Sequence, residues 1–126
     1  MAGTRKVLVA EDSSVIQNVT KKILQFQNYE IIAVKNGKQV LDKINKDAFD
    51  VILMDINMPV MDGMECARAI RGLDDQQKSH IPIIAITGNA KNYSMEEFKE
   101  AGFNDYLPKP LDFDKLVETV KRYSEE

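Results

Sequence analysis

The sequence has few of the residues on which disulfide, redox and histidine chemistry depend. Its 126 residues include no tryptophan, one cysteine, Cys66, and one histidine, His80. A single cysteine cannot form an intrachain disulfide, so we expect an intracellular, cytoplasmic protein. Cys66 is expected to pack within a helix interface rather than to serve redox chemistry. His80 precedes a predicted strand, and a surface histidine is expected there rather than a phosphorylated one.

Long hydrophobic runs and a strong charge of one sign are also missing. The longest apolar runs, such as residues 51–54, are far below the roughly 18 residues that span a bilayer. No apolar segment typical of a signal peptide is visible, so no membrane insertion is expected. Lys and Arg number 17 against 20 Asp and Glu, a net charge of −3. Such a surface is not basic enough to follow a phosphate backbone, so no direct nucleic-acid binding is expected.

The composition is that of an ordinary globular protein, with 44% hydrophobic and 29% charged residues. This length fits one domain, and residues 1–126 are expected to form a single unit. Short apolar runs alternate with segments of helical periodicity from end to end. This strict alternation predicts an α/β fold, a doubly wound parallel sheet covered on both faces by five helices. The five predicted strands lie at residues 6–10, 30–34, 49–55, 81–87 and 105–107.

The first helix is predicted from an apolar stripe and a capping pattern. Ile16, Val19, Ile23 and Phe26 recur at helical spacing and are expected on one face. Ser14 has the spacing of a capping box with the glutamine three residues later.

The later helices are bounded by turn and cap residues. Residues 73–80 are polar and predict a loop. Ser94 and Glu97 have capping-box spacing, and the helix that they open is expected to end at Gly102. Asp112 is expected to cap the last helix.

Open parallel sheets bind ligands at the carboxyl ends of their strands. Glu11 and Asp12 follow the first strand, and Asp55 ends the third. Thr87 ends the fourth strand, and Lys109 lies just beyond the fifth. If the first and third strands are neighbours, three carboxylates converge and repel one another unless a cation intervenes. Mg²⁺ is the expected cofactor, because it prefers oxygen ligands and no histidine or cysteine here indicates a softer metal.

One of these carboxylates can act as a nucleophile toward a phosphoryl group and form an aspartyl phosphate. Asp55 is the best candidate, because it ends the most apolar strand, which we expect at the centre of the sheet. Mg²⁺ and Lys109 would neutralise charge on the phosphoryl oxygens, and Thr87 would donate a hydrogen bond.

Four stretches at strand ends resemble a known family. Together and in this order, they resemble the receiver domain of response regulators in two-component phosphorelay signalling, over about residues 5–123. The resemblance implies a flavodoxin-like fold with strand order 2-1-3-4-5. The stretches are VLVAED at 7–12, DINMPVMDG at 55–63, IIAIT at 83–87 and YLPKP at 106–110.

The resemblance also implies a role for each residue of the carboxylate cluster. Asp55 matches the phosphoacceptor, and Glu11 and Asp12 match the acidic pair that holds Mg²⁺. Asn57 matches the position whose backbone carbonyl joins the metal. Lys109 matches the lysine that contacts the phosphoryl group.

The remaining matched positions belong to the conformational switch. Thr87 matches the switch hydroxyl and Tyr106 the switch aromatic, whose ring is expected to move from a solvent-facing to a packed position. Lys109 and Pro110 match a peptide bond that is usually cis in the family. Gly88 stands where alanine is common, and it should still leave room for a phosphoryl group.

The implied function is a phosphoaccepting signalling switch and not a turnover enzyme. A phosphoryl group would pass from a phosphohistidine of a histidine kinase or histidine phosphotransfer domain to Asp55, with Mg²⁺ bound. The surface around the fourth predicted helix, the fifth strand and the last helix would then change shape. The segments at 74–79 and 81–83 are similar to receivers of hybrid sensor kinases, so a module of a hybrid histidine kinase is the alternative setting.

Three rival functions are weighed against this interpretation. A metal-dependent aspartyl-phosphate hydrolase needs an acid two residues after the nucleophile, where Asn57 stands. A nucleotide-binding module needs a glycine-rich loop after the first strand, and residues 11–14 do not form one. An inactive receiver that serves only as a scaffold would not need the acids together with Thr87 and Lys109.

Overall fold

The structure is a computed structural model that describes residues 5–88 and 93–124. Within these residues, five strands alternate with helices, as predicted from the sequence. Six helices are present rather than five, because the polar segment expected to be a loop contains the short helix α4. The elements are β1 Lys6–Ala10, α1 Ser14–Phe26, β2 Glu30–Val34, α2 Gly37–Lys46, β3 Val51–Asp55, α3 Gly63–Arg71, α4 Gln76–Ser79, β4 Ile83–Thr87, α5 Met95–Ala101, β5 Asp105–Pro108 and α6 Phe113–Ser124.

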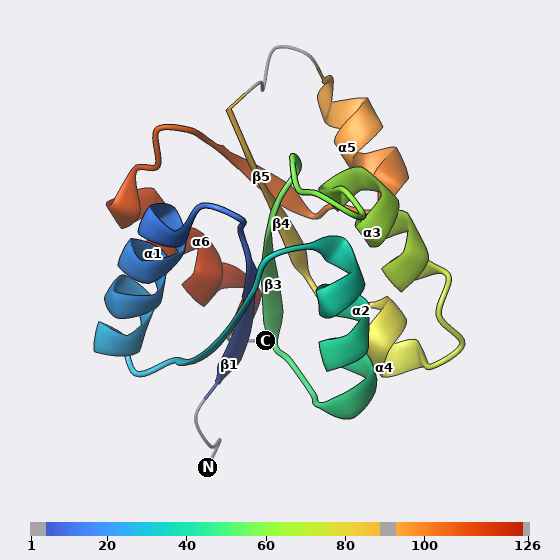
Figure 1. The fold of residues 1–126 in the computed structure, drawn as a ribbon, viewed down its shortest axis with the longest axis horizontal. Coiled ribbons are helices and arrows are strands. Elements are labelled where there is room, and N and C mark those ends of the chain that lie inside the picture. The colour runs from blue at the N-terminus through green and yellow to red at the C-terminus, as the bar shows by residue number, and fades with distance from the viewer. Residues whose placement is uncertain (1–4, 89–92, 125–126) are drawn as a thin grey trace.

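The five strands form one parallel sheet in the order β2-β1-β3-β4-β5. The flavodoxin-like order implied by the resemblance is therefore confirmed. Helices α1 and α6 cover one face of the sheet, and α2, α3 and α5 cover the other (Figure 1). Every residue of β3 and β4 is buried, as expected for central strands that are covered on both faces.

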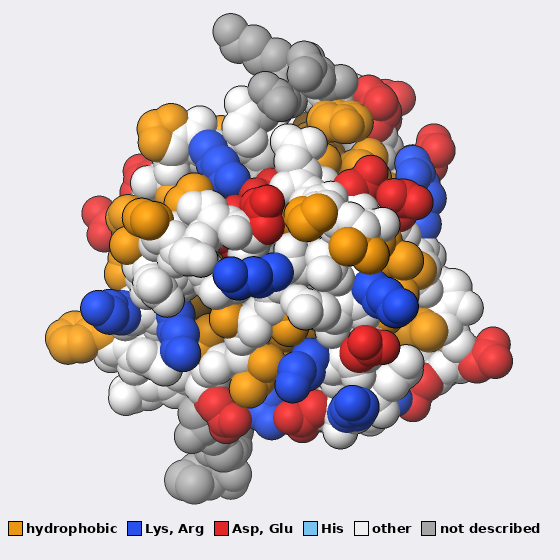
Figure 2. Space-filling view, in the orientation of Figure 1, with side chains coloured by type: hydrophobic (Ala, Val, Ile, Leu, Met, Phe, Trp, Pro, Cys, Tyr) orange, Lys and Arg blue, Asp and Glu red, His pale blue; other side chains and the backbone are white. Residues whose placement is uncertain are grey.

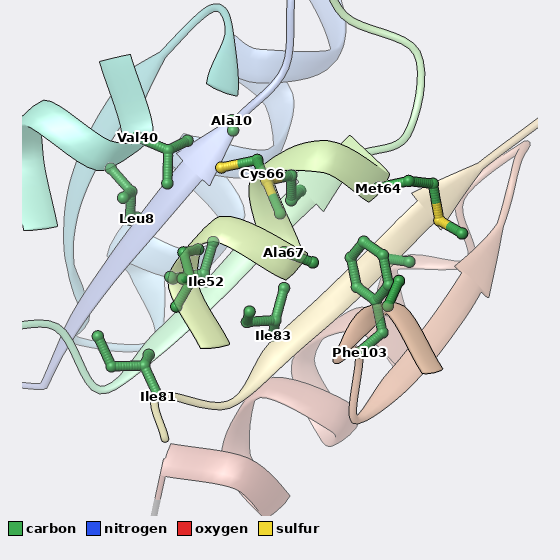
Figure 3. Packing of buried hydrophobic residues seen from close by; sticks show 14 of the residues in the cluster. Leu8, Ala10, Val40, Ile52, Met64, Cys66, Ala67, Ile81, Ile83 and Phe103 are labelled. Atoms are coloured by element: carbon green, nitrogen blue, oxygen red, sulfur yellow. The ribbon is translucent and has the colours of Figure 1, made fainter. Parts of the chain in front are cut away.

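The larger apolar cluster lies between the sheet and α2, α3 and α5. Figure 3 shows Leu8 and Ile52 on the sheet near Cys66 and Ala67 of α3, and all four side chains are fully buried. Complete burial of a leucine or isoleucine side chain contributes about 1.5–3 kcal/mol. The Cys66 thiol donates to the carbonyl of Gly37 at 3.4 Å, and burial raises its pKa to about 12. Cys66 therefore packs as an inert thiol, as predicted.

Helix α4 corrects the loop predicted for residues 73–80. Asp75 caps it, because its Oδ1 accepts from the backbone N–H groups of Gln77 and Lys78 at 2.9 and 3.1 Å. A helix of four polar residues has no apolar periodicity, so the sequence pattern could not reveal it. His80 follows directly and is exposed, as expected, with Nδ1 2.7 Å from the Gln76 carbonyl.

Helix α1 departs from the sequence prediction at its start and in its buried face. Its N-cap is Ser13 rather than Ser14, and Ser13 Oγ accepts from a backbone N–H. Thr20 and Leu24 are the buried residues of the helix, whereas Phe26 of the predicted stripe is 86% exposed. Periodicity locates an apolar stripe, but the neighbouring elements decide which face of the helix they cover. Among the residues that the structure describes, every helix falls short of the length and apolar character needed to cross a bilayer.

Candidate functional site

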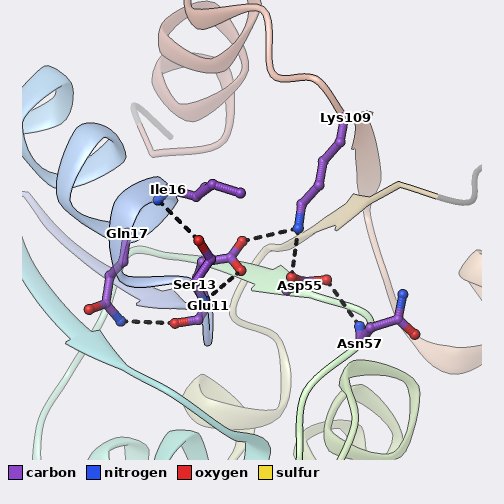
Figure 4. Close-up of polar contacts among 7 residues, drawn as sticks. All are labelled: Glu11, Ser13, Ile16, Gln17, Asp55, Asn57 and Lys109. Atoms are coloured by element: carbon purple, nitrogen blue, oxygen red, sulfur yellow. Dashed lines mark hydrogen bonds and ion pairs between the residues drawn. The ribbon is translucent and has the colours of Figure 1, made fainter.

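The sheet brings predicted site residues together at the carboxyl ends of its strands, and Figure 4 shows Glu11, Asp55 and Lys109 pointing toward one another. Glu11 follows β1 and Asp55 ends β3, and these two strands are neighbours. Thr87 ends β4, and Lys109 follows β5. Four segments far apart in the sequence therefore contribute to one site, as expected for a parallel sheet.

Asp55 is held by two donors. It is only 2% exposed, and its Oδ2 accepts from Lys109 Nζ at 2.8 Å. Its Oδ1 accepts from the backbone N–H of Asn57 at 3.0 Å. Such partners offset the cost of burying a carboxylate and hold its oxygens in a fixed direction.

Lys109 supplies the cation of this site. Its Nζ also lies 3.4 Å from Glu11 Oε1, so one ammonium group serves two buried carboxylates. Burial opposes the charge on Lys109, but the hydrogen bond and attraction to Asp55, assisted by Glu11, outweigh it and raise the pKa of the lysine. Lys109 therefore stays protonated wherever the protein is folded near neutral pH.

Glu11 is the least satisfied group of the site. It is 1% exposed, and its Oε2 accepts from the backbone N–H of Ser13 at 3.2 Å. Its Oε1 accepts no hydrogen bond from the described residues, despite the nearby lysine. Burial, together with the adjacent carboxylate of Asp55, raises the pKa of Glu11 to about 7. A buried carboxylate oxygen in this position needs a further cation to stay ionised.

The donor set fits a hard divalent cation. Carboxylate oxygens of Glu11, Asp12 and Asp55 lie within 4.8 Å of one another. Asp12 is exposed, so the cluster opens to solvent on one side. Oxygen-only ligands with room for water are what Mg²⁺ prefers. The orphaned Glu11 oxygen and this spacing therefore fit Mg²⁺, which the sequence predicts as the cofactor.

The loop after β3 is shaped to hold Asp55 in place. Gly63 donates its N–H to the Ile56 carbonyl at 2.8 Å. A Cβ on Gly63 would lie 2.5 Å from the Asp55 carbonyl oxygen, so only glycine fits. Val60 has φ of 70° and is spanned by a 2.7 Å hydrogen bond from Met61 N to Pro59 O, which makes a γ-turn. The sequence does not indicate this turn, because valine normally avoids positive φ.

Thr87 and Tyr106 lie beside the cluster on adjacent strands. Thr87 is buried, and its carbonyl accepts from the backbone N–H of Lys109 at 2.8 Å. Tyr106 pairs with Ala85 in the β4–β5 register. Its ring stacks on Phe98 of α5, with centroids 5.4 Å apart and an interplanar angle of 17°. The ring is half-buried here, which corrects the solvent-facing position expected for it.

The Lys109–Pro110 peptide bond is cis. Among the described residues, a Cβ on Gly88 would meet Lys109 Cδ at 3.9 Å, an ordinary contact. Residues 89–92, which follow Gly88, lie outside the described residues.

Comparison with known proteins assigns the chain to a family. A family model described as "Response regulator receiver domain" matches residues 7–121. The chain belongs to this family, so it is a receiver domain of two-component signalling. Domains of this family are phosphoaccepting switches and not enzymes with a metabolite substrate.

Two curated relatives illustrate different settings of the same domain. Hybrid signal transduction histidine kinase I of Dictyostelium discoideum is 40% identical over 121 residues, which is 92% of this chain and 7% of that protein. The polar-differentiation response regulator DivK of Brucella ovis is 31% identical over 120 residues, covering 95% of this chain and 96% of that protein. The chain thus spans a small fraction of the hybrid kinase and nearly all of DivK.

Solved structures agree with this assignment. The receiver domain of the sensor histidine kinase PA1611 from Pseudomonas aeruginosa PAO1 has a TM-score of 0.88 and 33% identity, covering 98% of this chain and all of that one. That structure has a magnesium ion coordinated in its active-site cleft. Chemotaxis response regulator CheY4 of Vibrio cholerae has a TM-score of 0.85 and 33% identity, covering 96% of this chain and 99% of that one.

Proposed function

We propose that Asp55 accepts a phosphoryl group from a phosphohistidine on a histidine kinase or histidine phosphotransfer domain, in a step that requires Mg²⁺. The observation that carries this proposal is the position of Asp55. It is a buried carboxylate between Lys109 Nζ and the Asn57 N–H, beside a Glu11 oxygen without a hydrogen bond. We further propose that residues 1–126 act as one receiver unit.

The proposed transfer forms one bond and breaks another. A carboxylate oxygen of Asp55 bonds to phosphorus while the phosphorus–nitrogen bond of the donor breaks, and the electron pair of that bond returns to the imidazole nitrogen. Lys109, already 2.8 Å from Oδ2, would balance the negative charge of the phosphoryl oxygens.

Glu11, Asp12, Asp55 and the carbonyl of Asn57 would hold Mg²⁺. When bound, Mg²⁺ neutralises carboxylate and phosphoryl charge and orients the phosphoryl group. Before the metal binds, Lys109 shares its charge between Glu11 and Asp55, 3.4 and 2.8 Å away. The proton that burial favours on Glu11 must leave when the metal binds, because a protonated carboxyl is a poor ligand.

The donor is proposed to be a protein, because the site adjoins an apolar surface. Val15 is 73% exposed, and Val19 and Phe113 are also exposed although hydrophobic. Figure 2 shows hydrophobic side chains at the surface over α1, on the left of the view. The donor must reach Asp55, so its own apolar surface would cover this region. A cavity of about 240 Å³ here is lined by Val15, Ile16, Val19, Lys109, Pro110, Leu111 and Phe113.

We propose that phosphorylation changes the shape of the surface formed by α5, β5 and α6. The fourth predicted helix corresponds to α5, since α4 adds one to the numbering. The Thr87 hydroxyl would donate a hydrogen bond to the phosphoryl group, which would move Thr87 toward Asp55. Tyr106, on the neighbouring strand, would then change its packing. Such coupling is typically about 1–3 kcal/mol, so we expect a shift in populations and not refolding.

Asn57 also distinguishes this proposal from a hydrolase. A phosphohydrolase using an aspartyl phosphate would need an acid where Asn57 stands, and an amide cannot take that role. The chain is therefore proposed to catalyse only its own phosphorylation and dephosphorylation, as a separate receiver or within a hybrid kinase.

Intact-mass measurement with phosphoramidate tests the assignment. We expect one added phosphoryl group in the presence of MgCl₂ and none in EDTA or in Asp55→Asn. Asp42→Asn, an exposed acid on α2, is the matched control and should be labelled normally. Phosphorylation that persists in Asp55→Asn would contradict the assignment of Asp55 as the acceptor. Phosphorylation by ATP alone would contradict the phosphohistidine donor.

A further inference from the structure

Arg71, the last residue of α3, joins three other parts of the chain. Its Nε donates to the carbonyl of Gly102 at 2.9 Å, at the C-terminal end of α5. Its Nη1 donates to the carbonyls of Ser79 and Ile81, both at 2.8 Å, on either side of the turn between α4 and β4. Its Nη2 donates to Asn104 Oδ1, also at 2.8 Å. Four of the five guanidinium N–H groups therefore have partners.

These partners are all neutral. Arg71 makes no ion pair with a carboxylate of the described residues, although it is half-buried, and burial lowers the pKa of its guanidinium. A buried charge without a counter-ion is costly unless hydrogen bonds compensate it. The four hydrogen bonds must therefore form together, and this favours a rigid junction.

Gly102 allows the arginine to come this close. Its φ is 112°, which suits glycine, and a Cβ there would lie 2.5 Å from Arg71 Cγ. Asn104 extends the junction into the sheet, because its Oδ1 also accepts from the backbone N–H of Ile83 at 2.8 Å. Ile83 begins β4, the strand that ends at Thr87. The junction thus lies at the opposite end of β4 from the phosphoacceptor site.

The two ends of α5 are fastened differently. At the N-terminal end, the side chain of Ser94 accepts from the N–H of Glu97, and Glu97 Oε1 accepts from the N–H of Ser94. These bonds stay within the helix. Met95 in the same turn is 42% exposed. At the C-terminal end, by contrast, Gly102 is bonded to another helix through Arg71.

We propose that Arg71 is a positioning residue that fixes the C-terminal end of α5 as a pivot. This inference rests on the proposed function. When Asp55 is phosphorylated and Thr87 is drawn toward it, the N-terminal turn of α5 moves while the Gly102 end stays in place. A helix of seven residues is about 10 Å long, so rotation about one end gives its largest displacement at the other. The movement is thereby directed to the exposed surface near Met95 and to the ring of Tyr106.

Two measurements on Arg71→Gln test the pivot. In the free protein, amide hydrogen exchange at residues 102–104 should be about tenfold faster or more, because several hydrogen bonds to a charged group are lost. Exchange at Glu96 and Glu97 should not change. Arg68→Gln is the matched control, since Arg68 is exposed one turn earlier on α3, and it should behave as the native protein.

The second measurement adds beryllofluoride and Mg²⁺ and follows amide NMR shifts along α5. In the native protein we expect large shifts at residues 94–97 and small ones at 101–104. In Arg71→Gln the two ends should shift equally, while beryllofluoride affinity is unchanged. Arg71→Lys should also lose the gradient, because an ammonium group cannot reproduce the planar fork of four bonds.

The outcomes separate the pivot from the proposed function. If the difference in NMR shifts between residues 94–97 and 101–104 persists in Arg71→Gln, the pivot is wrong. It is also wrong if the native protein shows its largest shifts at residues 101–104. Failure of the native protein to bind beryllofluoride would contradict the proposed function instead. Amide hydrogen exchange in the free protein would still test whether Arg71 holds the junction. Unchanged protection of residues 102–104 in Arg71→Gln would refute that role. If Arg71→Gln does not fold, Asn104→Ala removes only one of the four bonds and serves for both measurements.

Discussion

Lys109 Nζ lies 2.8 Å from Asp55 Oδ2, although two strand positions separate their segments in the sheet. Asp55 ends β3 and Lys109 follows β5, so the lysine side chain reaches past the end of β4. Gly88 follows β4 beside this path, and even a Cβ there would lie 3.9 Å from Lys109 Cδ, an ordinary contact. The ion pair therefore depends on three adjacent strands keeping their register.

Replacing Lys109 by methionine is expected to lower the free energy of unfolding by about 1–2 kcal/mol without metal, because two buried carboxylates lose their shared cation. Mg²⁺ should stabilise this variant more than the native protein, because in the variant the metal no longer competes with the Lys109 ammonium group. Urea denaturation with and without MgCl₂ measures both effects. Lys115→Met, on the exposed side of α6, is the control. Equal Mg²⁺ stabilisation of Lys109→Met and the native protein would contradict the shared-cation interpretation.

The raised pKa of Glu11 predicts a pH dependence of metal binding and stability. Between the ordinary value of 4.5 and about 7, the folded protein keeps a proton that the unfolded chain has released. The folded state then binds more protons, so without metal this group's contribution to stability falls as pH rises through that window. Mg²⁺ needs the ionised form, so its affinity should fall by up to about tenfold per pH unit below 7.

Titration calorimetry between pH 5 and pH 8 (roughly spanning the window set by the shifted and unshifted carboxyl values) measures this dependence. Glu11→Gln should bind Mg²⁺ more weakly and lose the slope below 7, because the titrating carboxyl is gone. A slope of the same size in Glu11→Gln would assign the proton to another group.

The γ-turn at Val60 predicts a stabilising substitution. A β-branched residue at φ of 70° costs about 1–3 kcal/mol, and asparagine tolerates this region better. Val60 is also 78% exposed, so its side chain loses little apolar contact. Val60→Asn is expected to raise the free energy of unfolding by about 1 kcal/mol in urea denaturation. Val15→Asn, at an exposed position of α1 without positive φ, should instead be neutral or destabilising.

Substitution by alanine is expected to be harmless at one glycine of the site and destabilising at another. Gly88→Ala should leave stability and labelling by phosphoramidate unchanged, because its Cβ would make an ordinary contact at 3.9 Å with Lys109. Gly63→Ala places a Cβ 2.5 Å from the Asp55 carbonyl oxygen, so it should cost more than about 2 kcal/mol and reduce labelling. Thermal denaturation and intact mass test both, and a stable, fully labelled Gly63→Ala would refute the close-fit argument.

Thr87→Ala should separate binding from transmission. The variant is expected to bind beryllofluoride but to show smaller amide and ring shifts at Tyr106, because the hydroxyl that links the two is missing. Thr20→Ala, a buried threonine on α1, is the matched control and should keep the native shifts. Unchanged shifts at Tyr106 in Thr87→Ala would show that the signal takes another route.

Local sequence patterns were sufficient to predict where the strands lie and which polar residues follow them. Apolar runs such as Val51–Asp55 are distinctive, and alternation with helices leaves a parallel sheet as the simple arrangement. Once the sheet is parallel, residues that follow its strands must meet at one edge. Glu11, Asp55 and Lys109 could be assigned to that edge on this basis, whereas the strand order that makes them neighbours came from the family resemblance.

The features that only the tertiary structure decided depend on contacts between elements distant in sequence. The buried face of α1 carries Thr20 and Leu24, because the neighbouring elements and not the apolar stripe choose which side is covered. The junction at Arg71 exists because α3, α5 and the start of β4 converge there, and an isolated arginine in a sequence does not indicate its partners. The close approach at Gly63 likewise arises from the path of the backbone after Asp55, which local residue preferences do not encode.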